Sequence, residues 1–76
     1  MVMNYAYSKE VGRNISAIRQ SKRWTQEQLS AKLQTLGCDI TRSALAKIEV
    51  GQRHLYPDEL KALKTVLEIG YDELFV

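Results

Sequence analysis

Residues 24–51 of this 76-residue chain read WTQEQLSAKLQTLGCDITRSALAKIEVG, and they carry its clearest structural signals. Thr25 and Gln28 stand three positions apart, which is the spacing of a capping box at the start of a helix. Thr41 is a second candidate N-cap, ahead of another short helical pattern. The stretch therefore predicts two short helices joined by a turn, over about 26–36 and 42–50.

The flanks of these two helices support the same boundaries. Trp24 and Leu29 occupy the two positions of a hydrophobic staple, which fixes how the chain enters a helix. Gly37 and Gly51 each follow a helical pattern, and glycine can end a helix in the left-handed conformation at little cost.

The rest of the chain also reads as helical. We expect a first helix over about 8–22 with Ser8 as N-cap, a fourth helix beginning at Pro57, which suits the first helical position, and a short fifth helix over about 71–75. No segment alternates apolar and polar residues convincingly, so the sequence predicts an all-α fold, a compact bundle of five helices. The apolar stripes expected to form its core are Val11, Ile15 and Ile18; Leu29, Leu33 and Leu36; Leu45 and Ile48; Leu60, Leu63 and Leu67; and Leu74 and Phe75.

Length and composition narrow the possible classes of protein. The chain is expected to be one small domain with a single core, with residues 1–7 as an N-terminal tail and 8–76 as the folded unit. No apolar run approaches the roughly 20 residues of a membrane span, and nothing resembles a signal peptide, which predicts a cytoplasmic protein without a membrane partner. The single cysteine and single histidine cannot form an internal disulfide or a protein-only zinc site, so we expect no metal and no cofactor. An enzyme has little support, because no acid–base pair is spaced for catalysis.

The charges are distributed unevenly along the chain. Residues 1–53 hold nine Lys/Arg and four Asp/Glu, a net +5, whereas residues 54–76 hold two Lys/Arg and five Asp/Glu, a net −3. Such a division indicates either a polyanionic partner for one face or an ordinary solvated surface.

The helix expected over 42–50 carries its charges in the unfavourable order. Arg42 opens it and Glu49 closes it, although the helix dipole favours acids at the start and bases at the end. Arg42, Ser43 and Lys47 share one narrow, acid-free face with the small residue Ala46 in the middle. This face is either an ordinary exposed surface or one that suits the DNA major groove, where Arg and Lys bond guanine O6 and N7. For Glu49 we expect an internal partner, and Arg19 on the first helix is the best candidate.

Together these features resemble the phage-repressor and Cro-like (XRE-type) DNA-binding domains. The resemblance covers about residues 11 to 75 and implies a lambda-repressor-like fold, with the second and third helices forming a helix-turn-helix. The matching segments are VGRNISAIRQSKRWTQEQLSAKL (11–33), ITRSALAKIEVGQR (40–53) and PDELKALKTVLEIGYDELF (57–75).

The resemblance also implies roles for individual residues. It implies an ion pair between Arg19 and Glu49, in agreement with the charge argument. The residues it places against base edges are Gln26, Arg42, Ser43 and Lys47, and for Gln26 it allows a phosphate contact as the alternative. The residues it places against the DNA backbone are Thr25, Thr41, Gln52 and Arg53.

The chain departs from the family pattern in three places. The link from Leu33 to Thr41 is about one helical turn longer than usual, which affects how the third helix docks. Ser30 stands where the second helix usually has alanine, and Tyr56 stands where a capping Ser, Thr or Asp is usual before the fourth helix.

The resulting hypothesis is a transcriptional regulator that binds double-stranded DNA sequence-specifically and reads the major groove with the third helix. We expect it to act as a repressor. The alternative is an antitoxin-like interaction module that binds a protein partner as well as its operator. One recognition helix reads only a few base pairs, so we expect a homodimer at least on DNA. The residues that could form the dimer contact, or else complete the core, are Ile69, Tyr71, Leu74 and Phe75.

Overall fold

The computed structural model of the protein describes residues 5–74 and shows five helices in that range, with no strand. The helices are α1 (Tyr5–Ser21), α2 (Gln26–Thr35), α3 (Arg42–Glu49), α4 (Pro57–Leu67) and α5 (Tyr71–Leu74). The expected all-α, five-helix fold is confirmed. Residues 1–4 of the expected tail, together with Phe75 and Val76, lie outside the described range.

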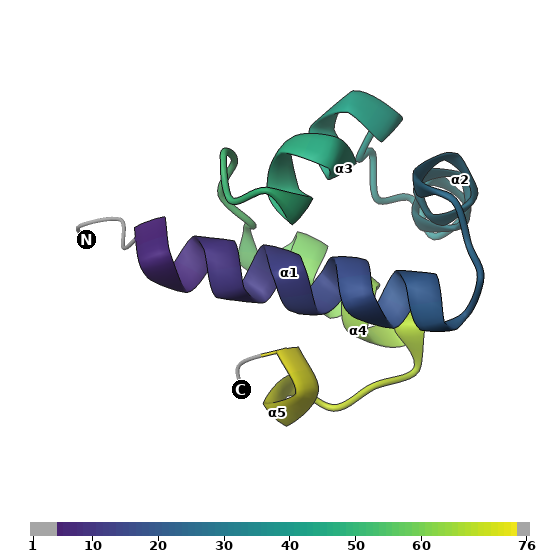
Figure 1. Ribbon diagram of the computed structural model, residues 1–76. Helices are drawn as coiled ribbons and strands as arrows, with labels where there is room; N and C mark the ends of the chain where they lie inside the picture. Colours follow the sequence, from purple (N-terminus) through teal and green to yellow (C-terminus); the bar gives the residue numbers. More distant parts are fainter. Residues whose placement is uncertain (1–4, 75–76) are drawn as a thin grey trace.

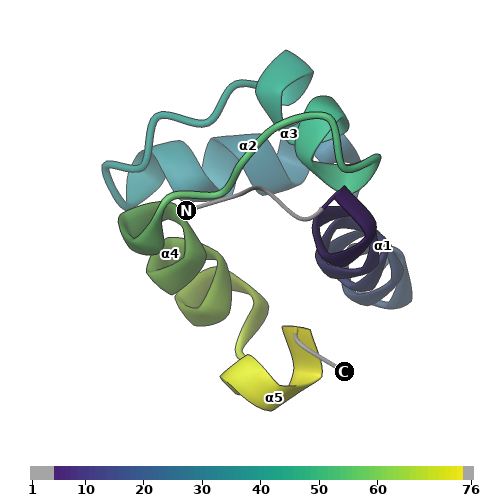
Figure 2. The ribbon, with the colours of Figure 1, turned by 90° about the vertical axis from the view of Figure 1, so that its left-hand side faces the viewer.

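The helices surround one core. The longest of them, α1, runs across the middle of Figure 1. In the same figure, α3 lies above α1, α2 is seen nearly end-on to the right of α3, and α5 lies below α1. Figure 2 shows α1 and α4 on opposite sides, with α2 and α3 above and α5 below. Contacts join α1 to α3 and α5, and α2 to α3 and α4. Among the helices described, none is both long and apolar enough to cross a membrane.

The core is built from the predicted stripes, except that Ile40 is buried and Leu36 is not. Its buried apolar residues are Val11, Ile15, Leu29, Leu33, Ile40, Leu45, Ile48, Leu63, Leu67 and Leu74, while Ile18 and Leu60 are half-buried against them. Leu36, which we expected to be buried, is instead 53% exposed, because α2 ends at Thr35 and Gly37 turns the chain with a φ of +83°. Ile40, which the periodicity did not single out, is fully buried.

Ile40 also explains how the long link between α2 and α3 is accommodated. The hydroxyl of Ser30 donates a hydrogen bond of 2.7 Å to the carbonyl oxygen of Ile40. Ser30 is buried, so the residue that replaces the usual alanine gives the link a polar attachment inside the fold. This hydrogen bond holds the C-terminal end of the longer link against α2, just before α3 begins.

The helix starts follow local chemistry at three of the four longer helices. Thr25 caps α2 in a capping box, since its hydroxyl accepts from the Gln28 N–H at 3.0 Å and the Gln28 side chain accepts from the Thr25 N–H at 2.8 Å. Thr41 caps α3, accepting from the N–H of Ala44 at 3.1 Å, and α4 begins at Pro57 as expected.

The expected start of the first helix is wrong. Helix α1 begins at Tyr5, so Ser8 lies inside the helix and is not its N-cap, and residues 5–7 are helical rather than part of a tail. Ala6 is among the strongest helix formers, and nothing in residues 5–8 breaks a helix, so the helical conformation extends past the candidate cap.

A close approach between α1 and the end of α3 depends on one glycine. A Cβ atom at Gly12 would lie 2.2 Å from the carbonyl oxygen of Ile48 and 2.8 Å from that of Glu49. Only a residue without a side chain lets the two backbones come this close. Gly12 therefore sets how closely α3 lies against α1.

Candidate nucleic-acid interface

Helix α3 presents a basic, acid-free surface to solvent. Arg42, Ser43 and Lys47 are all exposed, and Ala46 between them is half-buried. The other side of the helix carries Leu45 and Ile48 into the core. Its one acid, Glu49, is buried, so no carboxylate accompanies the exposed cations of α3. We call the set of Arg42, Ser43, Ala46 and Lys47 the α3 face.

The buried end of α3 is held by the ion pair between Arg19 and Glu49. Arg19 Nε donates to Glu49 Oε2 at 2.8 Å and Arg19 Nη2 donates to Glu49 Oε1 at 3.1 Å, so the contact is bidentate. The third guanidinium nitrogen, Nη1, donates to the carbonyl oxygen of Trp24 at 2.6 Å. The pair that the reversed charges predict is therefore present, and it ties α1, the α1–α2 turn and α3 together.

Gln26 joins the same cluster from the first turn of α2. Its Nε2 donates to Glu49 Oε1 at 3.0 Å, and the side chain is half-buried. The structure thus places Gln26 beside the end of α3, with part of its hydrogen-bonding capacity already used. This contact was not predicted from the sequence, because nothing in the local pattern links the two positions.

The residues expected at the DNA backbone have different surroundings. Thr25, Thr41 and Gln52 are exposed, and each threonine hydroxyl accepts a capping bond while its own O–H can still donate. Arg53 differs, because its guanidinium is already paired with a carboxylate. Arg53 Nη1 and Nη2 donate to the two oxygens of Glu59, each at 2.9 Å, and Nη1 also donates to the His54 carbonyl oxygen at 2.9 Å.

The pair between Arg53 and Glu59 closes the loop between α3 and α4. Glu59 Oε1 also accepts the backbone N–H of Tyr56 at 3.0 Å, so this carboxylate compensates for the missing side-chain cap at Tyr56. The hydrogen bond from Arg53 lowers the pKa of Glu59, helped by the Tyr56 N–H, although burial opposes the shift. Arg53 is thus first of all a structural residue, and any contact with phosphate must use its remaining N–H groups.

This lowered pKa predicts an acid-dependent stability. Because the carboxyl of Glu59 has a lower pKa folded than unfolded, its contribution is present above the ordinary value of about 4.3 and is lost as the pH falls through the folded pKa. We expect Glu59→Gln to be less stable than the parent by about 1.5 kcal/mol at pH 7, with the gap closing toward pH 3. Urea unfolding at a series of pH values measures the gap, and a constant difference across that range would contradict the assignment.

The comparisons with known proteins agree with this architecture. The sequence pattern of the helix-turn-helix family HTH_3 matches residues 15–74. The chain belongs to this family. The match includes both helices of the motif, α2 and α3, as well as Arg19 on α1 and the loop between α3 and α4.

Two solved structures share the fold of this HTH_3 domain. The restriction-modification controller protein C.AhdI from Aeromonas hydrophila is 30% identical, with a TM-score of 0.81 over 93% of this chain and 96% of that one. The DNA-binding domain of BldD is 19% identical, with a TM-score of 0.81 over 97% of this chain and 100% of that one, which shows the shared fold alone. No curated protein sequence matches the chain significantly.

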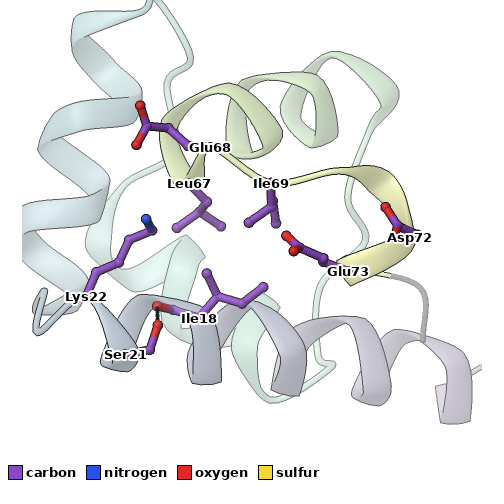
Figure 3. Close-up of a pocket in the computed structure, with 8 residues that line it drawn as sticks. All are labelled: Ile18, Ser21, Lys22, Leu67, Glu68, Ile69, Asp72 and Glu73. Carbon is purple, nitrogen blue, oxygen red and sulfur yellow. Dashed lines mark hydrogen bonds between the residues drawn. The ribbon is translucent and has the colours of Figure 1, made fainter.

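The HTH_3 domain also has an open groove on the side of α1 that faces α4 and α5. Its floor is apolar, formed by Ile18, Leu67 and Ile69, and Figure 3 shows these three side chains pointing toward one another. Its rim is formed by Ser21, Lys22, Glu68, Asp72 and Glu73. The Ser21 hydroxyl donates to the Ile18 carbonyl oxygen at 2.6 Å. Within residues 5–74 no group of His, Cys, Asp and Glu side chains is placed to hold a metal ion.

The candidate dimer residues separate into two kinds at this groove. Leu74 is fully buried and belongs to the core, whereas Ile69 is half-buried in the groove floor. Tyr71, two residues further along the chain, is 45% exposed. Phe75 lies outside the described residues. The structure thus leaves Ile69 and Tyr71 as the candidates for a contact with a second copy.

Proposed function

We propose that this HTH_3 protein is a sequence-specific regulator of transcription that reads the major groove of double-stranded DNA with α3. The observation that carries the proposal is the α3 face, a narrow basic surface with no exposed acid on the outer helix of a helix-turn-helix. Family membership supports a DNA-binding regulator rather than an enzyme. The similarity to a restriction-modification controller protein supports the same class.

The chemistry of the α3 face fits the edges of base pairs in the major groove. Arg42 and Lys47 carry donors that suit the two acceptors of guanine, N7 and O6, and the Ser43 hydroxyl can either donate or accept. Ala46 lies between them and adds little bulk, so the helix can lie close to the bases. An α-helix fits the width of this groove, and the polyanion offsets the unfavourable position of Arg42 at the start of α3.

We propose that the exposed residues around the motif hold the DNA backbone. Thr25 and Thr41 offer hydroxyl donors at helix N-termini, where the helix dipole also favours a phosphate, and Gln52 offers an amide just after α3. Such contacts fix the position of the protein on DNA but carry no sequence information. Arg53 contributes here only through the N–H groups that Glu59 and His54 leave free.

Truncation of the α3 face is expected to relax base preference. On a site obtained by in vitro selection, Arg42→Ala or Lys47→Ala should each weaken binding by about 1–3 kcal/mol and reduce discrimination at one base pair. Lys61→Ala is the matched control, because Lys61 is an exposed lysine on α4, outside the motif. Fluorescence anisotropy on the selected site and its single-base variants measures both quantities. If both variants select the same DNA as the parent with equal discrimination, the assignment of these two residues fails.

We propose repression as the mode of regulation, through an operator that overlaps a promoter. A reporter gene behind the selected site should then fall in expression when the protein is supplied. It should recover with the Lys47→Ala variant. An increase in expression with the parent protein would instead indicate an activator.

We further propose that two copies bind one operator as a two-fold dimer. One α3 face reads only a few base pairs, and paired half-sites about one helical turn apart are the usual solution for this motif. The groove floor and the exposed Tyr71 supply apolar surface for such a contact. Sedimentation of the protein with its selected site should give two chains per site and an inverted repeat. One chain on a site without that symmetry would contradict the dimer.

A further inference from the structure

Gln26 is held by a residue that lies inside the fold and does not itself reach the surface. Glu49 is buried, and its Oε1 accepts from both Gln26 Nε2 at 3.0 Å and Arg19 Nη2 at 3.1 Å. Its second oxygen, Oε2, accepts from Arg19 Nε at 2.8 Å. Gln26 is therefore the outer member of a chain of contacts that begins at a buried ion pair.

The chemistry of Glu49 determines which way the Gln26 amide points. A carboxylate only accepts hydrogen bonds, whereas a glutamine amide has a donor end and an acceptor end. The reverse orientation would place the amide oxygen against a carboxylate oxygen, two acceptors without a hydrogen between them. The amide nitrogen therefore faces Glu49, and the amide oxygen faces away from it.

This orientation leaves a defined set of groups free on Gln26. The amide nitrogen has two hydrogens, of which one is used by Glu49, so one N–H and the Oε1 acceptor remain. One donor and one acceptor are what a glutamine needs to bond adenine N7 and N6 together. A phosphate offers acceptors only, so it would use the remaining N–H of Gln26 and leave its oxygen to solvent.

We propose that Glu49 is a positioning residue for DNA recognition, which orients the Gln26 amide so that Gln26 reads an adenine. The proposal rests on the proposed function, since it assigns one base contact within that interface. It makes the buried ion pair more than a structural support: Arg19 holds Glu49, Glu49 holds the Gln26 amide, and the amide discriminates the base.

The proposal predicts that a residue without access to DNA changes base preference at one position. In Glu49→Gln, the new amide can turn a donor toward Gln26, so the Gln26 amide no longer has one preferred orientation. We expect Gln26→Ala to lose about tenfold of the preference for adenine at one position of the selected site. Glu49→Gln should lose preference at that same position and no other. In the double variant, Glu49→Gln should add no further loss to that of Gln26→Ala.

The measurement is the ratio of affinities of the full chain for the selected site and for its variants at each base pair. This ratio separates recognition from folding, because a partly unfolded sample loses affinity for every sequence by the same factor. Thermal unfolding followed by circular dichroism identifies a temperature at which each variant is folded. Gln20→Ala and Glu10→Gln are the matched controls, since both residues are exposed on α1, and neither should change any ratio.

Four outcomes distinguish the possibilities. Loss of the adenine preference at one shared position in both single variants supports the proposal. If the chain selects a DNA sequence but Gln26→Ala weakens all variants equally, Gln26 binds backbone and the proposal is overturned, while the proposed function stands. If Glu49→Gln keeps the full preference that depends on Gln26, the positioning role is overturned. If the parent selects no sequence, the proposed function itself fails.

Discussion

Replacing Glu49 by alanine is expected to lower the free energy of unfolding by about 3–5 kcal/mol. The substitution leaves the guanidinium of Arg19 without its bidentate partner, and the side chain of Arg19 is only 11% exposed. A buried charge without a partner is far more costly than a broken surface pair, which contributes up to about 1 kcal/mol. A loss of this size approaches the whole stability expected of a domain with 76 residues.

The test compares single and double variants under conditions that keep all of them folded. Urea unfolding in a stabilising osmolyte gives the free energy for the parent, Arg19→Met, Glu49→Leu and the pair together. We expect the double variant to be more stable than Glu49→Leu alone, because it no longer buries an unpaired guanidinium. A coupling energy near zero in this cycle would show that the ion pair does not stabilise the fold.

Replacing Gly12 by alanine is expected to have the second largest effect, at or above the upper end of the roughly 1–3 kcal/mol typical of overpacking. The new methyl group would lie 2.2 Å from the Ile48 carbonyl oxygen, and a backbone atom cannot turn aside as a flexible side chain can. Alanine favours a helix over glycine by about 1 kcal/mol, which offsets only part of the loss. The backbone of α3 would have to move away from α1.

Thermal unfolding and DNA binding together measure this effect. Arg13→Ala is the control, since Arg13 is the exposed neighbour on the same helix and should change stability by less than about 0.5 kcal/mol. If Gly12→Ala is as stable as the parent, the close contact between α1 and α3 is not required. The position of α3 would then have to be set by other contacts, such as the ion pair.

Local chemistry made most helix boundaries predictable. Thr25, Thr41 and Pro57 mark the starts of α2, α3 and α4 because a cap or a proline acts within one turn. Ser8 was misleading because a serine has the chemistry of a cap without always acting as one, and the helix continues before it. Leu36 was misassigned because periodicity alone does not tell where a helix ends.

The burial of Ile40 and the close approach of α3 at Gly12 could not be predicted from the helical periodicity of the sequence. Ile40 stands just before the cap Thr41, with Leu45 at the fourth helical position, so the two occupy the places of a hydrophobic staple. That signal could have identified Ile40 as buried. Gly12 had no comparable signal, because its role depends on a helix more than 30 positions away in the chain.

The candidate site was predictable where charge and spacing acted together. The spacing of Arg42, Ser43 and Lys47 placed them on one face, and all three are exposed in the structure. The reversed charges of α3 pointed to an internal partner for Glu49. The pair between Arg53 and Glu59 was missed, because it bridges a loop whose path the sequence does not define.

Methylation interference tests most directly whether the α3 face reads base edges in the major groove. Methylation of guanine at N7 blocks the major groove, whereas methylation of adenine at N3 blocks the minor groove. On the selected site, the parent protein should be excluded by N7 methylation at specific guanines, and Lys47→Ala should lose interference at one of them. Interference by adenine N3 methylation alone, unchanged in Arg42→Ala and Lys47→Ala, would contradict major-groove reading by the α3 face.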